Sequence, residues 1–282
     1  MEILLFDLGP EECAPLPASD HPHVRLIRLG PTDLLSSARV RGIRMAQAPV
    51  IGFMEEHCEM PPGWAEKILA HYDKSWAAVG SDFVNANPDA GLSNKAFRMN
   101  YGIYVRPSRL PTVPLMASQT FKRDVLLRYE PELELLLNAD LVLQRKMQQD
   151  GYELFYEPEV KMAHRNENTF RSMAVGAFYW NWCFANVRAQ VSGWRPIRRS
   201  IWIVLAPSIP WIRLFRLCIR LLRGGYLSPI QFLGDVPFIL AISHIAVAGQ
   251  VAGLLCGIER GAREFSNFEM NEPRLLRADP LS

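Results

Sequence analysis

Residues 37–64 of the chain read SARVRGIRMAQAPVIGFMEEHCEMPPGW. The helix predicted by the apolar spacing of this stretch runs from Ser36 to Gln47, and Pro49 marks its end. The apolar run Val50 to Met54 then predicts a buried strand, and the acidic group Glu55-Glu56-His57 follows at its carboxyl end. Pro61-Pro62-Gly63 opens a second helix. A helix, a strand with a polar end and another helix are the repeating units of an α/β fold.

Further strands are predicted on both sides of this stretch. They are short runs of apolar residues, bounded by turn-forming residues, at Ile3 to Phe6, Val24 to Leu29, Ala77 to Val84 and Glu153 to Tyr156. Because these strands alternate with helical segments, the pattern favours a mostly parallel sheet with helices on both faces.

The segments between the strands are less regular. The helix after Gly63 is expected to place four apolar residues on one face: Trp64, Ile68, Leu69 and Tyr72. The proline-rich segment from Pro88 to Gln119 predicts loops that line a cleft. Asp124 to Gln149 is predicted to be helical in two pieces, broken at Pro131. A separate segment, Val160 to His164, follows the last strand.

The bulk composition is that of a folded protein. The 282 residues are 49% hydrophobic and 21% charged, and the net charge of +2 gives no indication of a nucleic-acid partner. The five cysteines include no CxxC pair, which favours a reducing compartment and indicates no zinc site. Met1 leads directly into a strand-like run rather than a signal peptide, so the soluble part is expected to face the cytoplasm.

The character of the chain changes after Asn166. Thr169 to Val191 predicts an aromatic-rich helix, and Val236 to Gly257 is a small-residue-rich apolar stretch of about 20 residues, just enough to cross a bilayer. Between them, Ile201 to Leu222 is apolar with arginines at helical spacing, as in a helix lying in a membrane interface. Between residues 188 and 223 the chain has eight arginines and no acidic residue; the arginines are at positions 188, 195, 198, 199, 213, 216, 220 and 223. The pattern indicates an anionic membrane surface. For Val236 to Gly257, both a spanning arrangement and a re-entrant or interfacial hairpin fit the composition.

The polar group after Val50–Met54 has the residue types of a metal site. In an open α/β sheet, ligands bind beyond the carboxyl ends of the strands, where Glu55 and His57 are placed. A divalent ion held there could neutralise the charge of an anionic ligand such as a phosphate group. Taken by spacing alone, a Glu-Glu-His group is more often a solvated loop.

The order of the motifs resembles the family 2 glycosyltransferases. In these enzymes an Ala-Arg-x-x-Gly helix leads to an apolar strand, then Asp-x-Asp, then Pro-Gly-Trp, and residues 37–64 follow that order with Glu55 and His57 at the two aspartate positions. The similarity continues through Ala78-Val79-Gly80, the segments 120–127 and 138–152, and the closing Pro-x-x-x-x-x-His element that ends at His164.

The resemblance assigns roles to individual residues. Asp140 takes the position of the catalytic base, and Asp7, Arg39 and Glu55 fall on the nucleotide donor site. A divalent cofactor, Mn²⁺ or Mg²⁺, would be held by Glu55, His57 and His164. From the residues alone, Asp140 is better explained as a helix cap and His164 as a structural histidine, and Asp7 is equally well explained as a turn residue.

The resemblance also implies an architecture and an activity. It implies a GT-A-like α/β domain over residues 1–165, short at its N-terminus because the chain opens on what is the second strand of the family, and a helical, membrane-associated region over residues 166–282. The expected reaction moves a sugar, with inversion, from a nucleotide-diphosphate donor to a cell-envelope or lipid-linked glycan at the cytoplasmic face of the membrane. The alternative is a non-catalytic, membrane-bound relative, because Ala139 stands where the family has a glutamate beside the base.

Overall fold

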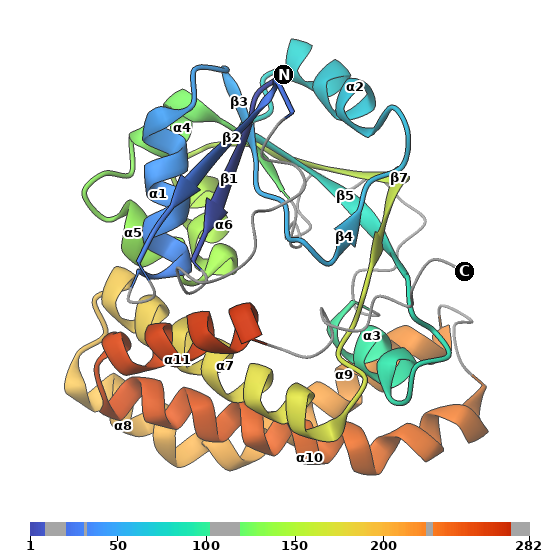
Figure 1. Cartoon of the computed structure of the whole chain (residues 1–282). Helices are drawn as coiled ribbons and strands as arrows, with labels where there is room; N and C mark the ends of the chain where they lie inside the picture. Colours follow the sequence, from blue (N-terminus) through green and yellow to red (C-terminus); the bar gives the residue numbers. More distant parts are fainter. Residues whose placement is uncertain (9–20, 31–32, 102–118, 224–227, 272–282) are drawn as a thin grey trace.

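The computed structural model describes residues 1–8, 21–30, 33–101, 119–223 and 228–271 (Figure 1). The centre of the loop segment predicted between Pro88 and Gln119 lies outside the described residues, as does Cys13. The side chains of Arg220 and Arg223 are also outside them.

The described residues form two sheets. The larger has five strands in the order β3 (Val50–Gly52), β6 (Thr120–Lys122), β5 (Ala78–Asn85), β7 (Leu154–His164) and β4 (Cys58–Glu59). The strands β1 (Ile3–Asp7) and β2 (Val24–Arg28) form a separate parallel pair. This is the mixed α/β class expected from the alternation of strands and helices.

The pairing within the larger sheet differs from the prediction. The central strands β5 and β7 are parallel, whereas β3 with β6, β5 with β6, and β4 with β7 are antiparallel. The expectation of a mostly parallel sheet is therefore wrong for this sheet. Strands β6 and β4 have three and two residues, too few to produce a periodic pattern in the sequence.

Helices cover both faces of the larger sheet. Six of the helices in the described part of the chain precede the C-terminal region: α1 (Leu35–Met45), α2 (Trp64–Leu69), α3 (Ser93–Asn100), α4 (Arg123–Leu127), α5 (Leu133–Leu136) and α6 (Asp140–Gln149). Because side chains alternate along a strand, Ala78 of β5 packs into a core with α1, α4, α5 and α6, while Val79 packs into another with α2. Helices on both faces are thus confirmed.

Three local predictions differ from the structure in detail. The helix after Gly63 ends at Leu69 and continues as a 3₁₀ turn, η1 (Ala70–Asp73), so Leu69 is 49% exposed instead of sharing the buried face of Trp64 and Ile68. The segment 124–149 forms three helices rather than two. The strand Glu153–Tyr156 and the segment Val160–His164 are one strand, β7, with an irregularity opposite the Ser81/Asp82 step of β5.

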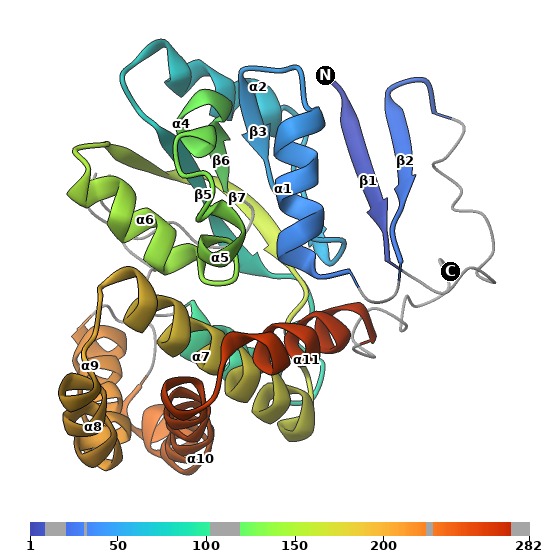
Figure 2. The same cartoon turned by 90° about the vertical axis from the view of Figure 1, so that its left-hand side faces the viewer.

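The C-terminal helices form one layer below the α/β part in both views (Figures 1 and 2). They are α7 (Phe170–Val191), α8 (Pro196–Leu205), the 3₁₀ turn η2 (Ala206–Ser208), α9 (Ile209–Arg223), α10 (Pro229–Leu255) and α11 (Ile258–Asn271). Phe184 and Val187 of α7 join the core beneath α6, which attaches this layer to the sheet.

Small residues allow α7 and α10 to approach closely, as the sequence predicts. A Cβ atom added to Gly249 would lie 2.1 Å from the carbonyl oxygen of Phe178, and one added to Gly253 would lie 2.2 Å from that of Trp182. Two stretches, Pro196–Ile219 and Pro229–Leu255, are long and apolar enough to cross a membrane. Only 17% of the most apolar window of the first is buried inside the protein, against 56% for the second.

Candidate functional site

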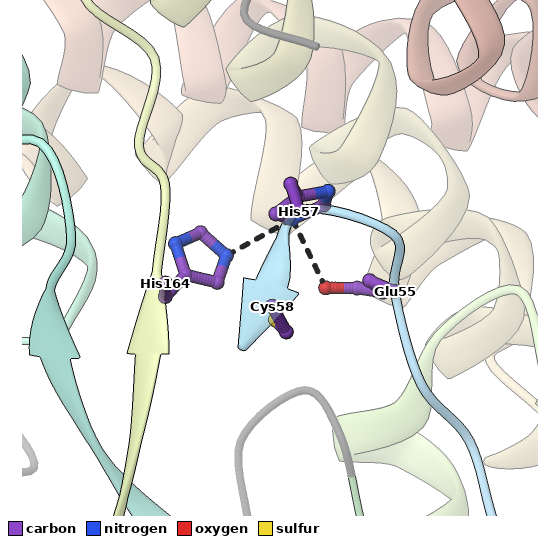
Figure 3. Close-up of side chains that lie close together, drawn as sticks. All are labelled: Glu55, His57, Cys58 and His164. Atoms are coloured by element: carbon purple, nitrogen blue, oxygen red, sulfur yellow. Dashed lines mark hydrogen bonds and ion pairs between the residues drawn. The ribbon is translucent and has the colours of Figure 1, made fainter. Parts of the chain in front are cut away.

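The pairing of β4 with β7 brings two distant polar segments together. Glu55 and His57 lie in the turn between β3 and β4, and His164 is the last residue of β7. Cys58 of β4 pairs directly with His164, so the antiparallel register places the turn beside the end of β7 (Figure 3). The backbone N–H of Arg165 also donates to the carbonyl oxygen of His57, which fixes the two segments against each other.

Four possible ligand atoms converge at this point. His57 Nε2 lies 3.1 Å from His164 Nε2 and 3.3 Å from a carboxylate oxygen of Glu55. With Cys58 Sγ, these atoms all lie within 4.8 Å of one another. Both histidines are buried, being 4% and 3% exposed. The side chain of Glu56 is 61% exposed, and its Oε1 lies 3.7 Å from His57 Nδ1.

Asp140 and Arg39 extend this group from the other side. Asp140 is the first residue of α6, and Arg39 lies in the middle of α1. The guanidinium of Arg39 reaches both carboxylates, with Nη1 3.5 Å from Asp140 Oδ1 and Nη2 3.7 Å from Glu55 Oε1. It also lies 5.6 Å from the centre of the Phe53 ring, which restricts its position. The arginine therefore links the candidate base to the candidate metal ligands.

The helix-cap reading of Asp140 does not describe its position. The N-cap of α6 is Ala139, and no side-chain cap bond is formed there. Asp140 instead directs its carboxylate toward Arg39. A carboxylate at the first helical position is also stabilised by the helix dipole, so the helix start holds it without using it as a cap.

The electrostatics of the two carboxylates differ. Burial alone would raise the pKa of Glu55, but its hydrogen bond and charge interaction with His57, with the charges of Arg39 and His164, lower that pKa to about 2. Burial raises the pKa of Asp140, and the negative charge of Glu55 adds to this while Arg39 opposes it. Glu55 is therefore the more acidic group and Asp140 the more basic one, which separates a charge-holding carboxylate from a proton acceptor.

A layer of hydrogen bonds surrounds His164. The hydroxyl of Tyr101 lies 2.9 Å from His164 Nε2, and Oδ1 of the fully buried Asn166 lies 3.1 Å from His164 Nδ1. Asn85 is the last residue of β5 and Asn87 lies two residues beyond it, and both form hydrogen bonds with Asn166. Ordered partners of this kind orient the ligating histidines of metal sites.

The group was found only in part by sequence reasoning. The structure brings together Arg39, Glu55, His57, His164 and Asp140, as predicted, and adds neighbours that the sequence did not single out: Cys58, Tyr101, Asn85 and Asn166. Asp7 ends β1 and forms an ion pair with Arg28 at 3.8 Å in the separate two-stranded sheet. Cys58 could have been found in the sequence because it is next to His57. Asn166 could have been found because it follows His164 by two residues.

The donor set fits a divalent ion of borderline softness. One carboxylate and two imidazoles can hold Mn²⁺, and the adjacent thiol also suits Zn²⁺, whereas Mg²⁺ prefers oxygen ligands. In a tetrahedral site, metal–ligand bonds of about 2.0–2.2 Å place neighbouring ligand atoms about 3.3–3.6 Å apart. The separations of 3.1 and 3.3 Å around His57 Nε2 lie near the lower end of that spacing, and the four ligand atoms all lie within 4.8 Å of one another.

Comparison with protein families identifies the class of this domain. Residues 2–123 match the family model described as Glycosyl transferase family 2. Residues 2–123 are thus similar to a family 2 glycosyltransferase domain, which supports a glycosyltransferase in general, with a nucleotide-sugar donor and a glycan acceptor as the substrates of that class. The matched part includes Arg39, Glu55 and His57 and ends before Asp140 and His164. A search of curated proteins finds no match to the chain.

Proposed function

We propose that this protein transfers a sugar from a nucleotide-diphosphate donor to a glycan or lipid-linked acceptor of the cell envelope, with inversion at the anomeric carbon. The observation that carries the proposal is the ion-paired set Glu55–Arg39–Asp140 beside His57 and His164. Arg39, Glu55 and His57 lie within the residues that match the family 2 model. Charge-binding groups and a proton acceptor meet there at the edge of one sheet.

Asp140 is the proposed general base. In a single displacement the acceptor hydroxyl loses its proton as it attacks the sugar, and a carboxylate within reach accepts that proton. The raised pKa of Asp140 makes it a stronger base than an exposed aspartate. Arg39, 3.5 Å away, holds the carboxylate in place and keeps it ionised.

The donor is proposed to bind between Asp7, Arg39 and Glu55. Arg39 lies between two carboxylates and offsets part of their negative charge, so the positive charge that a diphosphate needs would come from a bound divalent ion. Glu55, His57 and His164, with Cys58 beside them, would hold a divalent ion, and that ion would neutralise the departing diphosphate. The low pKa of Glu55 keeps this carboxylate charged at any physiological pH.

The acceptor is proposed to reach the site from a membrane. Helix α8 presents an exposed apolar stripe on one face, made by four residues at helical spacing: Ile197, Ile201, Val204 and Leu205. On α9, Trp211, Ile212 and Phe215 are also exposed. Because eight arginines and no acid lie between residues 188 and 223, this surface suits an anionic bilayer.

Aromatic and arginine side chains hold α8 against α7. The Arg188 guanidinium lies 4.7 Å from the Trp194 ring centre and 4.3 Å from that of Trp202, and the Arg198 guanidinium also lies 4.7 Å from the Trp194 ring centre. Burial lowers the pKa of Arg188 to about 10, with nearby Arg145 and Arg198 adding to the effect, so it still carries its charge. These cation–π contacts hold α8 in position, with its exposed apolar stripe facing solvent.

Helix α10 is proposed to support this surface rather than to cross the bilayer. Its Asp235 is buried and forms ion pairs with Arg98 at 2.6 Å and Lys95 at 3.4 Å, both from α3. An ion pair with the α/β part and the close contact with α7 both hold α10 inside the protein. We therefore propose a catalytic domain over residues 1–165 and a membrane-docking region over residues 166–282, lying on the cytoplasmic face.

A non-catalytic relative is the second candidate. Ala139, which is buried next to Asp140, supplies no carboxylate where the family has one. This candidate predicts an intact fold that binds to membranes without turning over any donor.

Turnover of nucleotide sugars tests the proposal against this second candidate. The purified protein, with Mn²⁺ and lipid-linked acceptors, is given a panel of nucleotide sugars, and release of the nucleoside diphosphate is measured. The proposal expects release that depends on the acceptor, and a product whose anomeric configuration, read by NMR, is opposite to that of the donor. Membrane binding without release from any donor would establish the second candidate instead.

A further inference from the structure

Asn166 lies at the centre of a buried polar network behind His164. Its side chain has no exposed surface, and its amide contacts the imidazole of His164, the side chain of Asn85 and the carbonyl of His164. A buried amide surrounded by other polar groups has one orientation in which every donor meets an acceptor. That orientation determines which nitrogen of His164 carries the proton.

The orientation of Asn85 can be assigned from backbone groups. The backbone N–H of Asn87 donates to Asn85 Oδ1 at 3.2 Å, and a backbone N–H is always a donor. The Ser93 hydroxyl also lies 3.0 Å from the same oxygen. On the other side of the amide, Asn85 Nδ2 donates to Asn94 Oδ1, and Asn94 Nδ2 donates to the carbonyl of Pro88 at 2.8 Å. Asn85 Oδ1 is therefore an acceptor.

The orientation of Asn166 follows from that of Asn85. Asn166 Nδ2 lies 2.8 Å from Asn85 Oδ1 and 3.1 Å from the backbone carbonyl of His164, which are both acceptors. The opposite amide orientation would place Asn166 Oδ1 against two acceptor oxygens. Asn166 Oδ1 therefore faces His164 Nδ1 at 3.1 Å, and this nitrogen must donate.

The backbone of Asn166 is held as firmly as its side chain. Its N–H donates to Asn87 Oδ1 at 2.8 Å, and its carbonyl accepts from Asn87 Nδ2 at 2.9 Å. A residue bound at the backbone and at the side chain cannot turn its amide without breaking several buried hydrogen bonds. The network thus has one arrangement, which it imposes on the imidazole of His164.

We propose that Asn166 is a positioning residue that holds His164 in the Nδ1–H tautomer, so that the lone pair of Nε2 faces Glu55, His57 and Cys58. This inference rests on the metal role in the proposed function and deepens it. With Nδ1 protonated, Nε2 is the atom that lies 3.1 Å from His57 Nε2 and 2.9 Å from the Tyr101 hydroxyl, which can donate to it. The imidazole is oriented for a cation before any cation binds.

The ring nitrogens of His164 give a direct test in the metal-free protein. The chain is labelled with ¹⁵N in histidine, and the ring spectrum is recorded at a pH where the imidazoles are neutral, with His164→Gln to assign the signal. The expected result is a protonated Nδ1 and an unprotonated Nε2 in His164. An unprotonated Nδ1 would overturn the proposal, and this outcome does not depend on transferase activity or on any variant of Asn166.

Variants of Asn166 separate positioning from a structural role. Asn166→Leu removes the acceptor, and Asn166→Asp keeps one while it loses the donors to Asn85. The affinity for Mn²⁺, measured by calorimetry, is expected to fall by about 10- to 100-fold in the leucine variant, the usual effect of losing an outer-shell partner. The aspartate variant is expected to keep the Nδ1–H tautomer and most of the affinity, although both variants lose stability.

A matched control uses another buried asparagine. Asn186 lies in α7 and donates to the carbonyl of Gly253 at 2.9 Å, far in the chain from His164. Asn186→Leu is expected to lower stability and leave the Mn²⁺ affinity unchanged. Wild-type affinity in Asn166→Leu, or equal losses in the leucine and aspartate variants, would contradict the proposal. A wild-type chain that binds no Mn²⁺ would instead contradict the metal role in the proposed function, while the ring spectrum would still decide the role of Asn166.

Discussion

The site around Glu55 and the contact between α7 and α10 are both buried, but different forces bury them. Around Glu55, the neighbours are ionisable groups joined by hydrogen bonds and ion pairs. Between α7 and α10, the neighbours are glycine backbones and aromatic side chains, with almost no free space. Substitutions at the first place should therefore change chemistry more than stability, and those at the second should change stability more than chemistry.

The largest expected effect is on turnover. Asp140→Asn keeps the shape of the side chain but cannot accept a proton, so turnover is expected to fall by about 10²- to 10⁴-fold. Nucleotide-donor binding and the melting temperature should stay close to wild type, because Asp140 caps no helix and its ion pair with Arg39 is partly exposed. Initial rates and calorimetry measure the two quantities.

The matched control for this variant is Asp124→Asn. Asp124 is an exposed aspartate near the start of α4 whose ion pair with Arg128 lies on the surface. It should retain wild-type turnover. Equal turnover rates in Asp140→Asn and Asp124→Asn would show that Asp140 is not the general base. They would also contradict the expectation that substitutions around Glu55 change chemistry more than stability.

The second largest effect is expected on the stability of the contact between α7 and α10. Gly253→Ala places a Cβ 2.2 Å from the carbonyl oxygen of Trp182, so α7 and α10 must move apart. The free energy of unfolding is expected to fall by about 1–3 kcal/mol, the usual cost of overpacking. Denaturant titration measures it, and turnover per folded molecule should remain that of the wild type.

Gly234→Ala is the control in the same helix. Nothing lies within 4 Å of a Cβ added at Gly234, so alanine should stabilise α10 by about 0.5–1 kcal/mol. Equal losses of stability at positions 234 and 253 would show that close packing does not distinguish the α7–α10 contact.

A smaller effect is expected on membrane binding. Ile201 and Val204 of α8 are 55% and 77% exposed, and the double serine variant removes apolar surface without removing internal contacts. Its affinity for vesicles that contain anionic lipid is expected to fall by about tenfold or more, since each buried side chain of this kind contributes about 1.5–3 kcal/mol. Vesicle sedimentation measures it.

Leu69→Ser removes an equally apolar side chain from another surface. Leu69 is 49% exposed at the end of α2, away from α8, and its loss should leave vesicle binding unchanged. If the double serine variant of Ile201 and Val204 binds vesicles as tightly as Leu69→Ser does, the proposal that α8 docks on the membrane is contradicted.

The smallest effect is a shift in the pH profile of turnover. Turnover requires the deprotonated form of Asp140, so it is expected to fall as the pH drops through the pKa of this group. Arg39 lowers that pKa, so Arg39→Gln should raise it and move the acid side of the profile to higher pH. Arg39→Lys keeps the charge and should move the profile less. An acid side that stays in place in Arg39→Gln would show that another group controls it.

The sequence predicted the larger strands well and the short ones poorly. The apolar runs at β1, β2 and β5 are long enough to show their period, and each is confirmed to within one residue at each end, whereas the run at β7 predicted only the first part of a strand that extends to His164. The pairing of β4 with β7 rests on two residues, so its register is a product of tertiary packing that no local pattern encodes. For this reason the sequence placed Glu55, His57 and His164 but not Cys58, which joins their group, or Asn166, which binds His164.

The contact between Arg39 and Asp140 also depends on tertiary packing that the sequence does not reveal. The family resemblance singled out both residues for separate roles, whereas their 3.5 Å approach depends on how α1 and α6 pack over the sheet. Likewise, the apolar composition of residues 236–257 could not distinguish a spanning helix from an interfacial one. The exposed stripe on α8 and the buried Asp235 of α10 are three-dimensional facts that favour the interfacial arrangement.

The most direct test of the account is calorimetric titration of the purified chain with a panel of nucleoside diphosphates, with and without Mn²⁺, alongside His57→Ala. The account predicts that one nucleotide binds in the presence of Mn²⁺, that binding weakens markedly without the ion, and that the histidine variant loses this dependence on the metal. Binding of no nucleotide under either condition would contradict the claim that the group of Glu55, His57, His164 and Asp140 is the donor site of a glycosyltransferase.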